Sequence, residues 1–259
     1  MAKTRLGFSA IVLVSTACLF LSFPPALLNA VSYDDHKRYY KIRNLDPEAV
    51  DESTRRLFKP VEYSIKAEKG VLDGASVFIV NRDETSATGD RVEHKFYVEI
   101  DTLRMVRVDR KMISRDGKLV ESREQYYKNH FYEYEPNTFH MEMLPLAAQK
   151  MDLNRGAETE FFVIMSPEFV PWGLYLAVDG EETVTVPAGT FECVRIKVKY
   201  KKENLPGFFK KMPSFFTDSL LPDIYLWVEK AEPHMMIKMQ GKVDGIVAPE
   251  KVHELVKVE

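Results

Sequence analysis

Alternation of apolar and polar residues with a period of two is the feature that most constrains the fold of this chain. Between residues 92 and 100, one alternating set is apolar with one histidine and the other is charged with one tyrosine: Val92, His94, Phe96, Val98 and Ile100 against Glu93, Lys95, Tyr97 and Glu99. A second run after Glu192 does the same: Val194, Ile196, Val198 and Tyr200 against Cys193, Arg195, Lys197 and Lys199. This pattern predicts β-strands that place one face on a core and the other in water.

Turn signals divide the chain at the spacing of β-hairpins. Asp116-Gly117 and Asp179-Gly180 each lie between strand-like runs, and Glu232-Pro233 separates two apolar alternations. In "VPAGTF", Pro187 pre-sets φ and Gly189 can adopt a positive φ, so a tight reversal is predicted before the strand that starts there. Because no long amphipathic helix lies between the strands, the sequence predicts a mostly β, antiparallel meander rather than a parallel sheet.

Three segments interrupt the strand pattern. Asp46 as N-cap and Pro47 at the first helical position predict a short helix over 47–57. Segment 138–156 is expected to be either a short helix or an irregular loop. Segment 204–222 combines prolines with four phenylalanines, so a loop insert with a short helix is expected there. One large β domain over 61–259, after a polar segment at 31–60, is the simplest organisation.

The first 30 residues resemble a secretory signal peptide. Lys3 and Arg5 precede an apolar run, and Leu28-Asn29-Ala30 offers a cleavage site. Export to the periplasm with cleavage of residues 1–30 is therefore predicted. The alternative is an inner-membrane anchor, because residues 6–23 are uncharged over a length at the lower edge of what spans a bilayer.

The carboxy-terminal half also carries a resemblance to a known family. "VPAGTFECVRIKV" followed by the hairpin "YLWVEKAEPHMMIKMQG", behind a signal peptide, resembles a family of uncharacterised bacterial periplasmic β-proteins, a domain of unknown function with a PAGTF-type turn. The fold that this resemblance implies is similar to the lipoprotein carriers of the Lol system. It is a single, strongly curved antiparallel half-barrel sheet with a concave apolar face and one or two short helices.

No catalytic or cofactor motif accompanies this pattern, so we predict no enzyme activity, no catalytic residue and no cofactor. His130, His140, Glu133 and Glu135 could form a metal set, but strand parity would point His130 and Glu133 to opposite faces, and no metal site is predicted. His94 is expected to be a core or cavity residue. Cys193 has a basic neighbour in Arg195 but no placed base, which leaves a small strand residue as the expected role.

Two functions remain open. The first is binding or carrying an apolar molecule, such as a lipid or a lipoprotein acyl chain, through six residues: Phe208, Phe209, Phe215, Phe216, Met236 and Trp227. The second is a non-enzymatic scaffold with a filled core that binds a protein partner of the cell envelope. A formal charge of −3 opposes nucleic acid as a partner.

Overall fold

The computed structural model describes residues 36–45, 60–127, 138–164, 171–201, 205, 211, 221, 223–243 and 249–259. Within these residues, 13 strands form one open sheet in the order β6-β5-β4-β3-β2-β1-β13-β12-β11-β10-β9-β8-β7. Every neighbouring pair is antiparallel except β7 with β8, which run parallel. The prediction of a mostly β, antiparallel fold is confirmed.

The amino-terminal strands form a meander in which each strand pairs with the next. Their bounds are β1 Arg38–Asn44, β2 Pro60–Leu72, β3 Ala75–Ser86, β4 Arg91–Glu99, β5 Met105–Ile113 and β6 Leu119–Tyr126. The predicted Asp116-Gly117 turn joins β5 to β6, with Gly117 at φ 82°.

The carboxy-terminal elements add the other half of the sheet. Their bounds are β7 Thr138–His140, the 3-10 turn η2 Met141–Met143, α2 Leu144–Lys150, β8 Glu158–Ile164, β9 Pro171–Val186, β10 Gly189–Tyr200, β11 Ile224–Glu229, β12 Met236–Gly241 and β13 Lys251–Val258. The last strand returns to pair with the first, which joins the two halves at the seam between β1 and β13.

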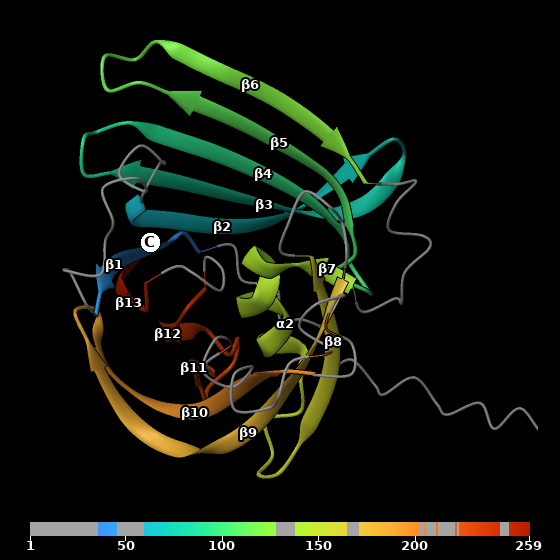
Figure 1. Ribbon diagram of the computed structural model, residues 1–259, viewed down its shortest axis with the longest axis vertical. Helices are drawn as coiled ribbons and strands as arrows, with labels where there is room; N and C mark the ends of the chain where they lie inside the picture. The colour runs from blue at the N-terminus through green and yellow to red at the C-terminus, as the bar shows by residue number, and fades with distance from the viewer. Residues whose placement is uncertain are drawn as a thin grey trace, which may run out of the picture.

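Figure 1 shows the sheet curling around α2, with β2–β6 above the helix and β9 and β10 below it. We call the face turned toward α2 the inner face. Its buried residues include Phe96 and Val98 of β4, Val194 and Ile196 of β10, and Leu226 of β11. Among the described residues, no helix has the length and apolar character to cross a membrane.

Most local predictions agree with the structure. The Pro187-Ala188 turn joins β9 to β10 with Gly189 opposite Val186, and Gly189 has φ 143°. The chain also reverses around Glu232-Pro233 between β11 and β12. Of the two alternatives for 138–156, a short helix or an irregular loop, the structure has the helix, as η2 and α2.

The turn expected at Asp179-Gly180 is wrong. Both residues lie inside β9, a continuous 16-residue strand. Arg195 of β10 pairs with Gly180 and Ile196 pairs with Val178, so Asp179 is an extra residue in β9. This β-bulge lets a long strand bend while it keeps its hydrogen bonds to β10, which a hairpin turn would end. The helix expected at 47–57, the signal segment 1–30 and most of 204–222 lie outside the described residues.

Candidate ligand-binding site

A row of basic residues crosses the inner face of β3–β6. The register places Arg82 of β3 opposite His94 of β4, His94 opposite Arg110 of β5, and Arg110 opposite Arg123 of β6. His94 shares its face with Val92 and Phe96, both almost completely buried, so the row lies on the inner face. We call these four residues the basic row.

In the described chain, carboxylates pair with the arginines of the basic row, but at its β6 end two arginines share one carboxylate. Arg82 pairs with Glu84 at 2.6 Å and stacks over the ring of Tyr63, 4.4 Å from its centroid. Arg110 and Arg123 both pair with Glu121, at 3.3 and 3.4 Å. The exposed fraction of the side chain rises from 33% for Arg110 to 68% for Arg123, so the row opens to solvent toward the edge strand β6.

The 3-10 turn η2 brings a third carboxylate, Glu142, to the basic row. Burial opposes ionisation of Glu142, but the charges of Arg82, His140, His94 and Arg110 outweigh this effect, and the pKa of Glu142 lies below its ordinary value. Glu142 Oε2 is buried and has no hydrogen-bond partner among the described residues. An ionised carboxylate therefore lies at the basic row with one buried oxygen whose hydrogen-bonding capacity is unused in the described chain.

The histidine at the centre of the row stays neutral at pH 7. Burial, with the charges of Arg82, Arg110 and His140, outweighs the opposing effect of Glu142 and lowers the pKa of His94 to about 4. Its ring stacks on Phe96, with centroids 5.5 Å apart, and its Nδ1 is buried without a hydrogen-bond partner in the described part of the chain. The prediction that His94 faces the core side of its strand is confirmed.

A second polar group extends the row toward the seam between β1 and β13. Tyr63 stacks on Tyr40 at 4.8 Å and meets the edge of His253, whose Nδ1 lies 3.4 Å from Tyr63 Oη. Burial, followed by the charges of Arg82 and Lys251, lowers the pKa of His253 well below its ordinary value. The side chains around Arg82 thus form a continuous polar strip on the inner face of the sheet.

The inner face of β9–β12 is mostly apolar. Its residues there include Leu174, Leu176, Val178, Val194, Ile196, Val198, Ile224, Leu226, Val228 and Met239. On β3–β5, Val80, Phe96 and Val108 form the row adjacent to the basic row. The inner face is therefore amphipathic, with charged groups concentrated on β3–β6.

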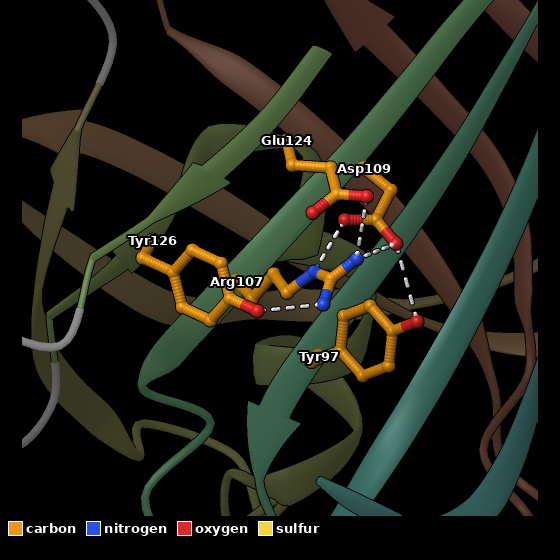
Figure 2. A network of polar contacts seen from close by, with 5 residues as sticks. All are labelled: Tyr97, Arg107, Asp109, Glu124 and Tyr126. Carbon is orange, nitrogen blue, oxygen red and sulfur yellow. Dashed lines mark hydrogen bonds and ion pairs between the residues drawn. The ribbon is translucent and has the colours of Figure 1, made fainter. Parts of the chain in front are cut away.

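The outer face of the same strands carries a different arginine environment. Figure 2 shows Arg107 of β5 donating to both carboxylate oxygens of Asp109, at 2.5 and 2.8 Å, and to Tyr126 Oη at 2.7 Å. Glu124 adds an ion pair at 3.2 Å, and Tyr97 donates to Asp109. The hydrogen bond to Asp109 is the main reason that the pKa of Arg107 is raised. The donors of Arg107 are already used within the sheet, which favours a structural role for this arginine.

The predicted apolar ligand residues are not brought together by the described part of the chain. Phe208, Phe209, Phe215 and Phe216 lie outside it. Met236 is buried opposite Val228, where its backbone carbonyl accepts a hydrogen bond from Tyr40 Oη at 2.9 Å.

Trp227 lies on the outer face, apart from the apolar inner surface. Trp227 lies opposite Arg195 of β10 and donates its indole N–H to Glu182 Oε1 at 2.7 Å. The ammonium group of Lys238 lies over its ring. Its neighbours Leu226 and Val228 point to the inner face, because successive strand residues alternate. Contact between Trp227 and a ligand would therefore require a surface on the outer face.

The structure gives Cys193 no feature of a nucleophile. The residue is fully buried, although a half-exposed position was expected for it. Burial, with the charges of Glu229, Glu192 and Glu182, raises the pKa of the thiol to about 12, so thiolate is scarce at neutral pH. No group of three or more potential metal ligands occurs among the described residues, while His130, Glu133 and Glu135 fall outside them.

Sequence reasoning did not find the basic row. Charged residues within a strand normally indicate its solvent face, and Arg82, Arg110 and Arg123 lie in charged stretches of β3, β5 and β6. The available signal was parity. Once Phe96 assigns His94 to the inner face, the cross-strand register assigns the three arginines to the same face, but that register is not contained in any local pattern.

Comparison with known proteins finds no matching family model and no matching curated protein. Among solved structures, the chain is similar to a β-barrel-like protein of the domain of unknown function DUF1849 from Brucella abortus, with 12% identity, a TM-score of 0.44 and coverage of 89% of this chain and 99% of that chain. It is also similar to the hypothetical lipoprotein YmcC from Escherichia coli, with 8% identity, a TM-score of 0.32 and coverage of 88% and 86%. A protein with a YmcC-like fold from Bacteroides fragilis matches at 10% identity and a TM-score of 0.33, over 87% and 96% of the two chains.

The fold and the site together define an open, predominantly antiparallel β-sheet protein with an amphipathic inner face. The likeness of its turn motif to the periplasmic family, and of its fold to the Lol-system carriers, stays a prediction.

Proposed function

We propose that this chain is an exported envelope protein that binds the apolar part of a lipid or an acyl chain on the inner face of its sheet. In this proposal the curled sheet acts as a half-barrel and α2 as its cover. The observation that carries the proposal is the apolar inner face of β9–β12, which packs against a single short helix in the described part of the chain.

Several features of α2 suit a cover that can be displaced. The helix has seven residues, its N-cap Met143 makes no side-chain capping bond, and its buried surface includes the small residues Ala147 and Ala148. A helix of this length is not stable alone, so its position depends on packing. Displacement would expose apolar surface to which each buried CH₂ of an acyl chain could contribute about 0.8 kcal/mol.

Lys150 of α2 forms hydrogen bonds to the amino-terminal half of the sheet. Lys150 Nζ donates to the backbone carbonyls of Ile100 and Asp101, at 2.5 and 3.2 Å, in the turn after β4. Removing this contact would loosen the end of the helix while leaving the apolar face unchanged.

Native mass spectrometry of the protein purified gently from the envelope fraction of its host tests the proposal. A lipid-sized adduct that an added apolar fluorophore displaces is the expected result. Lys150→Ala should accelerate uptake of the fluorophore, whereas the control Lys197→Ala, which removes an ion pair to Asp223, should not. A bare mass that stays bare after incubation with lipids would overturn the proposal.

A scaffold function is the second candidate, and the edge strand β6 favours it. In the described chain β6 pairs with β5 alone, and it exposes Leu119, Val120 and Tyr126 by 54, 59 and 49%. An unpaired edge with exposed apolar side chains can accept a strand from a partner. This candidate predicts no thermal shift with lipids and retention of an envelope protein that is lost in Val120→Lys. Neither candidate includes a reaction.

A further inference from the structure

We infer that the basic row binds the phosphate head group of an anionic amphiphile whose chain lies along the apolar part of the inner face. This inference rests on the proposed function and names the ligand class for the same face. It is carried by the geometry of Arg82, His94, Arg110 and Arg123 and by the residues on either side of them.

Within the part of the chain that the structure describes, Arg110 and Arg123 at the open end of the row have guanidinium donors without a partner. Each guanidinium offers five N–H donors in a planar fork that matches phosphate oxygens. Among the described residues, Arg110 and Arg123 have Glu121 as their shared ion-pair partner, at distances of 3.3 and 3.4 Å. Arg107 on the outer face, by contrast, uses its donors on Asp109 and Tyr126 (Figure 2). Arg107 is thus saturated on the outer face, whereas Arg110 and Arg123 keep donors available on the inner face of the described sheet.

An apolar row lies directly beside the basic row. Phe96 pairs with Val80 and Val108, and these three residues are two positions along their strands from His94, Arg82 and Arg110. Two residues of a strand span about 7 Å. The distance from the phosphate of a lipid to the first methylenes of its chain is of the same order. Head group and chain can therefore be bound on one continuous face.

The carboxylate of Glu142 lies where it competes with such a head group. Its negative charge interacts electrostatically with Arg82, Arg110 and His94, and its Oε2 has no hydrogen-bond partner in the described chain. Glu142 belongs to η2, which continues directly into α2. Movement of the cover would withdraw this carboxylate from the arginines at the moment that the apolar face opens.

The experiment compares dioleoyl phosphatidylglycerol with dioleoylglycerol, a neutral lipid with identical chains and no phosphate, by native mass spectrometry at low ionic strength. The wild-type protein should prefer the anionic lipid by about tenfold, as expected for charge-assisted hydrogen bonds to a phosphate. Arg110→Gln with Arg123→Gln should abolish the preference without reducing binding of the neutral lipid. Glu142→Gln should increase it, because a competing negative charge is removed.

The control is Arg91→Gln, an arginine of β4 on the outer face that pairs with Glu93. It should retain the wild-type preference, and thermal melts confirm that each variant folds. Since Arg123 is mostly exposed, Arg123→Gln alone keeps the test valid if another variant fails to fold.

The outcomes separate this inference from the proposed function. Equal binding of both lipids by the wild-type protein overturns the head-group inference and leaves apolar binding intact. Binding of neither lipid overturns both. Inorganic phosphate that binds with the same arginine dependence, and with no gain from the lipid chain, would assign the row to a free anion and overturn the amphiphile.

Discussion

At the scale of single residues, His94 makes the stability of the fold depend on pH. The folded-state pKa of about 4 is below the ordinary value of 6.5, so the unfolded chain binds a proton more readily in this interval. The contribution of neutral His94 to the free energy of unfolding is therefore fully present above pH 6.5. It is lost as the pH falls toward 4, by up to about 3 kcal/mol. Urea unfolding midpoints measured between pH 7 and pH 4 should fall accordingly.

The groups around His94 define the control for this prediction. His94→Gln should flatten the pH dependence between 6.5 and 4, and the remaining slope should come from His253, whose pKa is lowered in the same direction. Glu142, with a lowered carboxyl pKa, adds its own loss of stability as the pH falls below its ordinary pKa of 4.5, at the acid end of this interval and beyond it. An unchanged slope in His94→Gln would show that this histidine is not buried as neutral imidazole.

Cys193 gives a second prediction at this scale, about chemical reactivity. Its thiol is fully buried and has a raised pKa of about 12, so an aromatic disulfide reagent at pH 8 should not label the native protein. In denaturant, the chain without residues 1–30 should react with a stoichiometry of one, because Cys193 is then its single cysteine. Rapid labelling under native conditions would contradict the buried position.

At the scale of elements, packing of β12 against β11 depends on Gly241. This residue has φ 142°, and a Cβ placed on it would lie 3.0 Å from Ile224 Cα and 3.2 Å from the carbonyl oxygen of Asp223. Gly241→Ala should destabilise the fold by about 3 kcal/mol, because backbone atoms of β11 must move. Gly117→Ala is the matched control: at φ 82° with open space around it, it should cost about 1–2 kcal/mol. Chemical denaturation of the two variants checks the difference, and equal costs would refute the packing argument.

The elements also show how far a sequence of this kind can be interpreted. Alternation predicted β4 and β10, and turn chemistry predicted the reversals at Gly117 and Pro187, because both signals are local. The Asp179-Gly180 prediction failed because the same dipeptide serves a bulge as well as a hairpin, and the neighbouring strand decides between them. The basic row was missed for a related reason, since its charged residues become an inner-face group only through the register of four strands.

At the scale of the whole molecule, the sheet is continuous only because its first and last strands pair. Tyr40 of β1 stacks on Tyr63, and its hydroxyl donates to the carbonyl of Met236 on β12, 196 residues away. No sequence pattern predicts a pairing over such a separation, whereas hairpins follow from turns. The seam therefore determines whether residues 38–126 and 138–258 behave as one cooperative unit.

This dependence on the seam predicts one unfolding transition for both halves. The two tryptophans, Trp172 and Trp227, lie in the carboxy-terminal half, so their fluorescence reports on that half, whereas far-UV circular dichroism reports on both. The two signals should coincide in urea. Tyr40→Phe should shift both midpoints together by about 1 kcal/mol, because a buried hydrogen bond across the seam is lost. Tyr39→Phe, on the opposite face with an exposed bond to Glu259, should shift neither. Separate transitions in the wild-type protein would instead show that the halves fold independently and that the inner face is assembled from two units.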